Sequence, residues 1–305
     1  MGIGKEWEHI VRVIVFGANG FLGAYVYRKL TQPNHPAVHV IGTCGAGSEV
    51  RELIPQDLTS DAPVRHLLRD VQPDVVIWCV KAREGQDEIR LTQGGLSAVV
   101  DAVGHSSRII FVSTDAVLPG TAGHYGEATV PVESVGMTGL DHYINAKIEA
   151  ERLIGENSSD FCIVRPGPIF GTGVDGRWDA RTHRLLEALG RGERIEQPLN
   201  LIRTYAHVQD LAESLSELAR LPVNGVLHVG APTPASHFDF AMAVAHRASF
   251  STRLVRDFEI SPEEATGRQV RLDTSMDTSR AAQCLRTRFR SVPEALAEEP
   301  DETIR

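Results

Sequence analysis

The stretch that most constrains the fold is VRVIVFGANGFLGAYVYRKL, residues 11–30, in which a β-branched run leads straight into spaced glycines and a helical pattern. Glycines at this spacing allow a tight turn, close approach of the backbone to a pyrophosphate and packing of the helix on the strand. The pattern therefore predicts the first strand and helix of a dinucleotide-binding sheet; the alternative is an ordinary glycine turn. The candidate cofactor-binding residues of this loop are Gly17, Asn19, Gly20, Phe21, Leu22 and Gly23.

Apolar β-branched runs recur along the first half of the chain and alternate with segments of helical periodicity. Strands that are apolar on both faces and separated by helices belong to parallel sheets covered by crossover helices. We therefore expect an α/β fold built on a doubly wound parallel, Rossmann-type sheet. The strand-like runs lie at 11–16, 37–43, 74–80, 108–114 and 160–166, and the helix-like segments at 21–31, 61–70, 87–103 and 141–156.

The second half of the chain has a looser rhythm. A glycine-rich stretch after residue 166 is followed by patterns typical of a helix near 181–191, a strand and helix at 201–221, a strand at 225–230 and a helix near 236–248. We predict a dinucleotide-binding domain over residues 1–165 with part of 200–230, and a smaller C-terminal substrate-binding lobe over 166–199 and 231–305.

Composition excludes several classes of protein. With 42% hydrophobic residues and a net charge of −9, the chain is unlike disordered proteins and lacks the basic surface that a nucleic acid polymer or an anionic membrane requires. Its four cysteines form no metal-binding spacing, and no apolar run is long enough for a membrane span or a signal peptide. We therefore expect no metal site and a cytoplasmic location.

The segment LDHYINAK, residues 140–147, places a tyrosine four residues ahead of a lysine at the start of a predicted helix. Residues at i and i+4 share one helical face, so Tyr143 and Lys147 point the same way. Taken alone, such a pair often does no more than cover a helix surface with its apolar stems. Its meaning depends on the rest of the chain.

Together these features resemble the extended short-chain dehydrogenase/reductase family. The glycine spacing, STDAVLPG at 113–120 and the YINAK pair follow the order of that family. Several stretches resemble its dTDP-4-dehydrorhamnose reductase branch: HYGEATVPVE at 124–133, RPGPIFG at 165–171, TYAHVQDLA at 204–212 and LDTSMDTSRA at 272–281. The resemblance covers the chain from residue 11 to about 290.

The resemblance implies a catalytic set of Thr114, Tyr143 and Lys147. A phenol with a pKa of about 10 is a poor acid or base at neutral pH, but a lysine cation and a positively charged nicotinamide both lower that pKa. Tyr143 would then exchange a proton with the substrate oxygen, and Lys147 would also hold the nicotinamide ribose. Thr114, which the family pattern favours over Ser113, would donate a hydrogen bond to the same oxygen; its alternative role is to satisfy local backbone.

The family also implies NAD or NADP as cofactor. NADPH is favoured because the second strand ends in VIGTCGAG without an acidic residue for the ribose 2′-hydroxyl. Arg51 would meet a 2′-phosphate or lie on the surface, and Asp57 with Leu58 would contact the adenine, unless Asp57 only caps a helix. Lys81 stands where relatives usually carry alanine. The remaining candidate cofactor contacts are Cys79, Lys81, Arg165 and Gly167.

For the substrate, the resemblance implies a nucleotide-linked keto-sugar or a similar activated carbonyl compound. Arg203 would contact a diphosphate or form a surface salt bridge instead. Asp115 is followed by alanine rather than glutamate, which disfavours a dehydratase. The candidate substrate contacts are Ser113, Thr114, Asp115, Arg203 and Arg268.

Two alternatives to a reductase stay open on the sequence alone. One is an epimerase that retains its NAD. The other is a cofactor-binding regulatory subunit without turnover, because the regulatory subunit of methionine adenosyltransferase resembles the same branch. Dimers are common among relatives, so a homodimer fits the resemblance.

Overall fold

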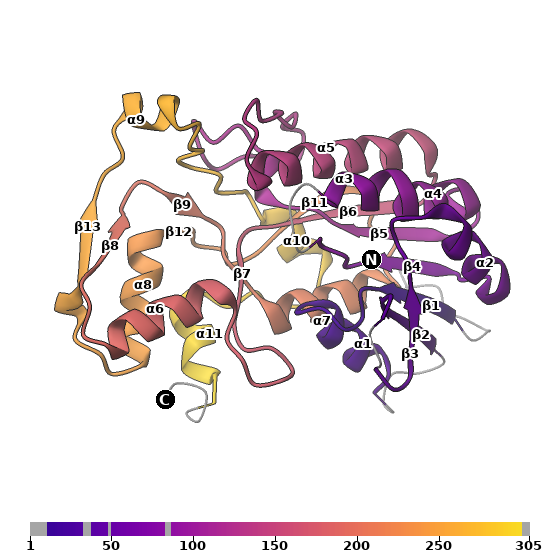
Figure 1. Ribbon diagram of the computed structural model, residues 1–305, viewed down its shortest axis with the longest axis horizontal. Coiled ribbons are helices and arrows are strands. Elements are labelled where there is room, and N and C mark those ends of the chain that lie inside the picture. The colour runs from indigo at the N-terminus through magenta and orange to yellow at the C-terminus, as the bar shows by residue number, and fades with distance from the viewer. Residues whose placement is uncertain (1–10, 33–37, 48–49, 83–86, 301–305) are drawn as a thin grey trace.

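The computed structural model describes residues 11–32, 38–47, 50–82 and 87–300. Seven parallel strands form the central sheet, in the order β3-β2-β1-β4-β5-β6-β11 (Figure 1). The predicted doubly wound parallel sheet is thus confirmed. The strands of the sheet are β1 (Val11–Phe16), β2 (Val38–Gly45), β3 (Leu53–Gln56), β4 (Val75–Trp78), β5 (Arg108–Val112), β6 (Phe161–Pro166) and β11 (Gly225–Val229).

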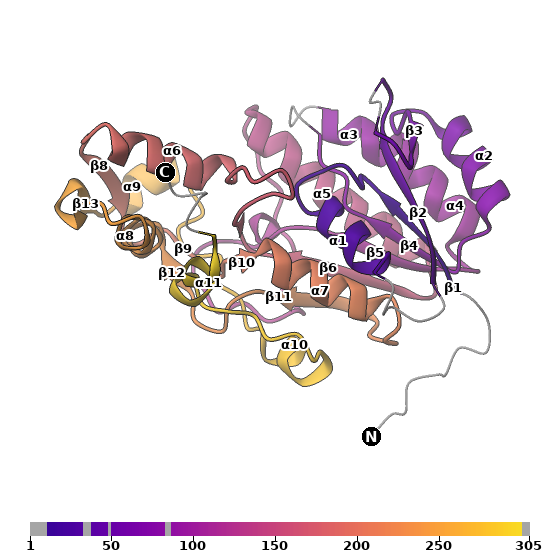
Figure 2. The same ribbon diagram turned by 90° about the horizontal axis from the view of Figure 1, so that it is seen from below.

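Helices cover both faces of this sheet. Residues of β1 alternate between the two faces, so Val13 and Val15 pack in one core cluster while Ile14 and Phe16 pack in the other. Helices α1 and α7 cover the first face, and α2 to α5 cover the second (Figures 1 and 2). The covering helices are α1 (Gly23–Leu30), α7 (Val208–Leu218), α2 (Asp61–Val71), α3 (Glu88–Leu91), α4 (Ser97–Val103) and α5 (Gly139–Asn157).

The helix predicted over 87–103 differs from a regular α-helix. It consists of α3, a π-helical stretch η2 (Thr92–Leu96) and α4. Two glycines lie in η2, and a Cβ on Gly94 or Gly95 would come within 2.4 or 2.6 Å of a backbone carbonyl oxygen of the loop after β3. The widened turn therefore accompanies a close approach of this helix to that loop.

The rest of the second half forms a smaller body at the carboxyl side of the sheet (Figure 1). Its core contains the aromatic rings of Phe170, Tyr205 and Phe240, with Tyr205 stacked on Phe240 at 4.6 Å between ring centroids. Its elements are β7 (Ile169–Phe170), α6 (Ala180–Gly190), β8 (Ile195–Pro198), β9 (Ile202–Arg203), β10 (Ala206–His207), β12 (Ala235–Ser236), α8 (His237–Arg247), the 3₁₀ turn η4 (Thr252–Leu254), β13 (Val255–Phe258), α9 (Pro262–Gly267) and α11 (Val292–Glu298). Outside this body, the 3₁₀ turn η3 (Asp115–Val117) follows β5, and α10 (Ser279–Cys284) packs on β11 of the central sheet.

Elements β11 and α7 return from the second half to the central sheet, since β11 pairs with β6 and α7 packs on α1. The division of the chain into a cofactor domain and a substrate lobe stays a prediction. Among the described residues, no helix has the length and apolar character that a bilayer crossing requires.

Candidate active site

The glycine loop joins β1 to α1 at the carboxyl edge of the sheet. Gly17 has a φ of +82°, a conformation that side-chain-bearing residues rarely adopt. A Cβ on Gly23 would lie 2.1 Å from the carbonyl oxygen of Gly17, so this position accepts no side chain without movement of the loop. The Ala18 N–H donates to the Thr43 carbonyl oxygen of β2 at 2.8 Å. The loop is therefore a fixed backbone cradle of the kind that fits a dinucleotide pyrophosphate.

The other predicted loop residues lie around this cradle. Asn19 and Gly20 are exposed at the tip, Phe21 is partly exposed, and Leu22 is buried in the core under α1. The backbone of Cys79, directly after β4, lies 3.3 Å from the position of a Cβ on Gly17. These residues gather at one edge of the sheet, as the carboxyl ends of parallel strands require.

The predicted adenine contacts have local roles in the structure. Asp57 is exposed, and its Oδ1 accepts hydrogen bonds from the Thr59 N–H at 2.9 Å and the Thr59 hydroxyl at 2.7 Å, which lower the Asp57 pKa. Leu58 is buried. Asp57 thus caps a turn just before α2 begins, and its predicted contact with adenine stays a prediction. Arg51 is exposed in the segment before β3, and its contact with a 2′-phosphate stays a prediction.

The predicted catalytic side chains come together at the carboxyl end of β5. Tyr143 and Lys147 lie on the first turns of α5, which begins with a capping box between Thr138 and Asp141. Lys147 is 3% exposed, and its Nζ lies 5.6 Å from the centroid of the Tyr143 ring. The Thr114 hydroxyl interacts with the Tyr143 phenol and lowers its pKa. Sequence and structure therefore place the same three groups in one cluster.

Ser113 has a separate role from Thr114. Its hydroxyl is buried and donates to Glu151 Oε1 of α5, whereas Thr114 is partly exposed. The Thr114 hydroxyl also accepts from the Ala116 N–H at 3.2 Å and thereby caps η3. Of the two hydroxyls, only that of Thr114 is positioned to meet a molecule bound beside Tyr143.

Lys147 has a charged partner that the sequence did not reveal. Glu88 Oε1 lies 2.8 Å from Lys147 Nζ, and the Glu88 side chain is 4% exposed. Two backbone carbonyl oxygens, of Val80 and Val112, accept from the same ammonium at 3.4 Å. Burial lowers the pKa of Lys147, but Glu88 and the Tyr143 phenol outweigh burial, so the net shift is upward. Lys147 is therefore held as a cation.

Tyr143 differs from the expectation that its pKa is lowered. Its ring is partly exposed, but the surrounding protein withdraws the phenol from water, and this burial raises the Tyr143 pKa. Lys147 lowers that pKa as expected, but Glu88 raises it again, and the net direction in the protein alone is upward. Lys81 Nζ also lies over the Tyr143 ring, 5.4 Å from its centroid. The phenol is thus protonated at neutral pH.

Arg165 and Gly167, predicted to contact the cofactor, are both buried. The Arg165 guanidinium is 2% exposed and binds Glu151 through two hydrogen bonds of 2.9 and 2.6 Å. A Cβ on Gly167 would lie 1.8 Å from the Thr204 carbonyl oxygen, so glycine is required there by chain packing. The structure gives these two residues architectural roles, and their predicted contacts with the cofactor stay predictions.

The predicted substrate residues are only partly gathered at the site. Arg203 donates to the carbonyl oxygens of Ile202, Arg271 and Leu272 and lies 3.7 Å from Asp115. Asp115 is buried and accepts from the Thr274 hydroxyl at 2.5 Å. A diphosphate would have to displace these internal partners of Arg203, so the contact predicted for it stays a prediction.

Arg268 contacts neither Arg203 nor Asp115 in the described part of the chain. Its side chain is 70% exposed and forms an ion pair with Glu264 on α9 at 2.7 Å. A different arginine, Arg181 at the start of α6, is electrostatically coupled to Asp115 and lies over the Tyr205 ring at 5.8 Å. Nothing in the sequence marked Arg181, because it lies in an ordinary helical pattern outside the stretches that resemble the family.

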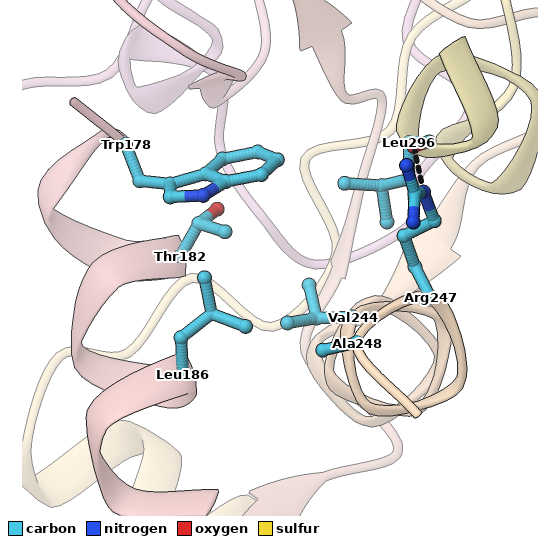
Figure 3. A pocket seen from close by; sticks show the side chains of 7 residues that line it. All are labelled: Trp178, Thr182, Leu186, Val244, Arg247, Ala248 and Leu296. Atoms are coloured by element: carbon cyan, nitrogen blue, oxygen red, sulfur yellow. Dashed lines mark hydrogen bonds between the residues drawn. The ribbon is translucent and has the colours of Figure 1, made fainter. Parts of the chain in front are cut away.

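A small pocket in the C-terminal body lies apart from these residues (Figure 3). It has about 170 Å³ of empty space, part of it open to solvent, between α6, α8 and α11. Trp178, Leu186 and Val244 line it, and the Arg247 side chain beside it donates to the Leu296 carbonyl oxygen at 2.8 Å. None of the predicted site residues lines this pocket, so it is separate from the Tyr-Lys cluster and its chemistry.

Among the described residues, no group of three or more histidine, cysteine, aspartate or glutamate side chains is arranged to hold a metal ion. None of the four cysteines forms a disulfide within the described part of the chain, and burial raises the pKa of Cys79 and of Cys162 to about 12.

This site combines a Rossmann-type sheet, a glycine loop after β1, a threonine after β5 and a Tyr-x-x-x-Lys helix. Together these features define a class of dinucleotide-dependent proteins. The model of the RmlD substrate binding domain family matches residues 11–302, and the chain belongs to that family. The resemblance to the dTDP-4-dehydrorhamnose reductase branch is thereby confirmed.

Two curated relatives and one solved structure show the range of proteins that the chain is similar to. It is 24% identical over 282 residues to the methionine adenosyltransferase 2 subunit beta of Bos taurus, covering 88% of this chain and 81% of the relative. It is 26% identical over 246 residues to the probable low-salt glycan biosynthesis reductase Agl14 of Haloferax volcanii, covering 74% and 76%. The dTDP-4-dehydrorhamnose reductase of Bacillus anthracis, solved in complex with NADP, superposes with a TM-score of 0.71 at 20% identity, covering 94% and 97%.

Proposed function

We propose that this protein is an NAD(P)H-dependent reductase of a nucleotide-linked keto-sugar or a similar activated carbonyl compound. The observation that carries the proposal is the meeting of Thr114, Tyr143 and Lys147 at the carboxyl edge of the sheet, beside the cradle formed by the glycine loop. The similarity to Agl14 and to a dTDP-4-dehydrorhamnose reductase solved with NADP supports both the substrate class and the cofactor.

The glycine loop suits a dinucleotide because the left-handed Gly17 and the close approach of Gly23 to the Gly17 carbonyl oxygen hold the loop in a tight turn at the start of α1. When bound in its reduced form, the dinucleotide supplies a hydride to the carbonyl carbon and is left oxidised. NADPH is the preferred form in this proposal, because β2 ends at Gly45 without an acidic residue that would repel a 2′-phosphate.

Tyr143 supplies the proton. As the hydride forms the new C–H bond, the carbonyl π electrons move to the oxygen, which takes the phenolic proton and becomes a hydroxyl. Because the raised pKa of Tyr143 keeps the phenol protonated at neutral pH, the resting state is the form that a reduction needs. Lys147 then stabilises the phenolate until it takes a proton from water, and Thr114 donates a hydrogen bond to the oxygen as its charge grows.

The experiment is a spectrophotometric screen of nucleotide-linked keto-sugars with NADPH and with NADH, in wild-type protein and in Tyr143→Phe. Tyr143→Phe should lose at least about 10²-fold in turnover and keep its affinity for the dinucleotide. Tyr27→Phe, which alters a partly exposed tyrosine of α1, serves as the control and should retain full turnover. Equal turnover in Tyr143→Phe and wild type would refute the proposal.

An epimerase is the related alternative. Such an enzyme would retain a tightly bound NAD through purification and would interconvert sugar isomers with no net consumption of NADPH. The same screen, read by chromatography of the sugar products, distinguishes it from the reductase.

A regulatory subunit is a candidate of a different class. The similarity to methionine adenosyltransferase 2 subunit beta over 88% of the chain favours it. In that case mixing the protein with a methionine adenosyltransferase catalytic chain should change the activity of that chain, and Tyr143→Phe should leave the effect unchanged.

A further inference from the structure

Glu88 is the first residue of α3 and the buried carboxylate nearest to the candidate catalytic lysine. Its Oε1 lies 2.8 Å from Lys147 Nζ, and its Oε2 accepts the Ala82 N–H at 2.7 Å. One carboxylate therefore joins the loop after β4 to the helix that carries Tyr143. Both of its oxygens have strong donors, as a carboxylate removed from water requires.

Burying the ion pair of Glu88 and Lys147 is costly in free energy. Taking a carboxylate and an ammonium out of water costs several kcal/mol for each ion in general, and well-packed apolar residues often stabilise a fold as well or better. The carbonyl oxygens of Val80 and Val112 also lie 3.4 Å from Lys147 Nζ, and Glu88 adds a negative charge to these neutral acceptors. The extra negative charge points to a function at the site.

Glu88 affects both members of the Tyr-Lys pair. It raises the pKa of Lys147, which keeps the ammonium charged, and it raises the pKa of Tyr143, which keeps the phenol protonated. The other charged and titratable groups around Tyr143 are Lys81 after β4, Asp115 after β5 and Cys79 beside Lys147. Among the described residues, no carboxylate is paired with Lys81.

We propose that Glu88 is a positioning residue that fixes the Lys147 ammonium and holds Tyr143 in its protonated form, which is the form that carbonyl reduction requires. This inference rests on the proposed reductase function and extends it to a residue that touches neither substrate nor hydride. It also assigns a role to α3, a helix in which the sequence pattern predicted no site residue.

The test compares Glu88→Gln with wild type. Glutamine keeps the shape and can still accept the Ala82 N–H, but it removes the negative charge. The alkaline limb of the pH profile for carbonyl reduction should therefore move to lower pH by roughly one unit or more. Asp87→Asn is the matched control: Asp87 is the neighbouring residue, with a 44% exposed side chain 3.7 Å from Arg90, and its profile should overlay that of wild type.

A second readout needs no substrate. The ultraviolet absorbance of the phenolate, measured as the difference between each protein and the same protein carrying Tyr143→Phe, reports the ionisation of Tyr143 directly. Glu88→Gln should ionise at lower pH than wild type. A shifted phenolate titration without turnover on any substrate would support the role of Glu88 and count against the reductase, so the two failures are distinguishable.

Glu88→Asp completes the set. Aspartate restores the charge but withdraws it from the ammonium by one methylene, so it should recover most of the wild-type alkaline limb and still have a lower kcat at an unchanged KM. This variant also carries the test if Glu88→Gln does not fold. Profiles and phenolate titrations of Glu88→Gln that overlay those of wild type, or kcat and KM values of Glu88→Asp equal to those of wild type, would overturn the proposal.

Discussion

Glu151 of α5 and Arg165 of β6 form a buried, two-pronged ion pair, with Arg165 Nε and Nη2 lying 2.9 and 2.6 Å from the two carboxylate oxygens. Tyr143, Lys147 and Glu151 follow one another at intervals of four residues, so all three share one face of the helix. Because Glu151 also accepts the Ser113 hydroxyl after β5, it fixes the rotation and height of α5 on the sheet. This anchor therefore positions Tyr143 and Lys147 of the proposed catalytic set.

The first prediction concerns this anchor. Glu151→Ala leaves the Arg165 charge buried without its partner and should lower the free energy of unfolding by about 3–5 kcal/mol. Arg152→Ala, at the next residue of the same helix, breaks an exposed pair with Glu156 and should cost about 1 kcal/mol or less. Urea denaturation of both variants checks the difference; similar losses would show that the buried pair does not anchor the helix.

The second prediction concerns the glycine loop. Gly23→Ala places a Cβ 2.1 Å from the Gly17 carbonyl oxygen, so the loop must shift, and both stability and dinucleotide affinity should fall, with about 1–3 kcal/mol lost in stability. Gly155→Ala is the control, because its Cβ meets nothing closer than 4.0 Å and alanine favours the helix by about 0.5–1 kcal/mol. Calorimetric titration with NADPH and thermal unfolding measure both effects; undiminished NADPH binding by Gly23→Ala would contradict the cradle.

The sequence was informative wherever a residue acts through local pattern. The β-branched runs predicted the strands because strands covered on both faces must be apolar, and the i, i+4 spacing placed Tyr143 and Lys147 on one face because helix geometry leaves no choice. The glycine loop followed in the same way, since backbone approach restricts those positions to glycine.

The sequence was uninformative where a partner comes from far along the chain. Glu88 and Lys147 are 59 positions apart, and Glu88 lies in an ordinary helical pattern, so nothing local marks it as buried. For Arg203, the sequence motif suggested a phosphate ligand. In the structure its N–H groups donate to carbonyl oxygens of the chain, and backbone acceptors cannot be recognised from a pattern of side chains. Long-range ion pairs and backbone acceptors therefore required the structure.

The third prediction separates the two hydroxyls after β5. Thr114→Val removes a donor that faces the site and should lower turnover about 10²-fold with little loss of stability. Ser113→Ala removes a buried hydrogen bond to the Glu151 carboxylate and should cost about 1.5–3 kcal/mol of stability while turnover stays near that of wild type. Steady-state kinetics and urea denaturation of both variants check this; the reverse pattern would assign catalysis to Ser113.

The last prediction concerns stability at acid pH. His228 of β11 is fully buried; its Nδ1–H donates to the Tyr125 carbonyl oxygen at 3.1 Å, and its Nε2 faces Arg165 at 3.4 Å. Burial, with the Arg165 charge, lowers its pKa from 6.5 to about 4. In the unfolded chain the imidazole binds a proton below its ordinary pKa, whereas in the folded protein it stays neutral until about pH 4. The unfolded state thus binds more protons in that window, and stability must fall as the pH falls through it.

The shift corresponds to roughly 3 kcal/mol of stability that is fully present above the ordinary histidine pKa and is lost by about pH 4. His228→Gln cannot take up the proton, so its free energy of unfolding should fall less steeply between neutral pH and pH 4 than that of wild type, whatever its value at neutral pH. His66→Gln, whose side chain is 71% exposed, should follow the wild-type slope. Urea denaturation across this pH range gives the three slopes, and parallel slopes for wild type and His228→Gln would show that the buried imidazole does not contribute to acid unfolding.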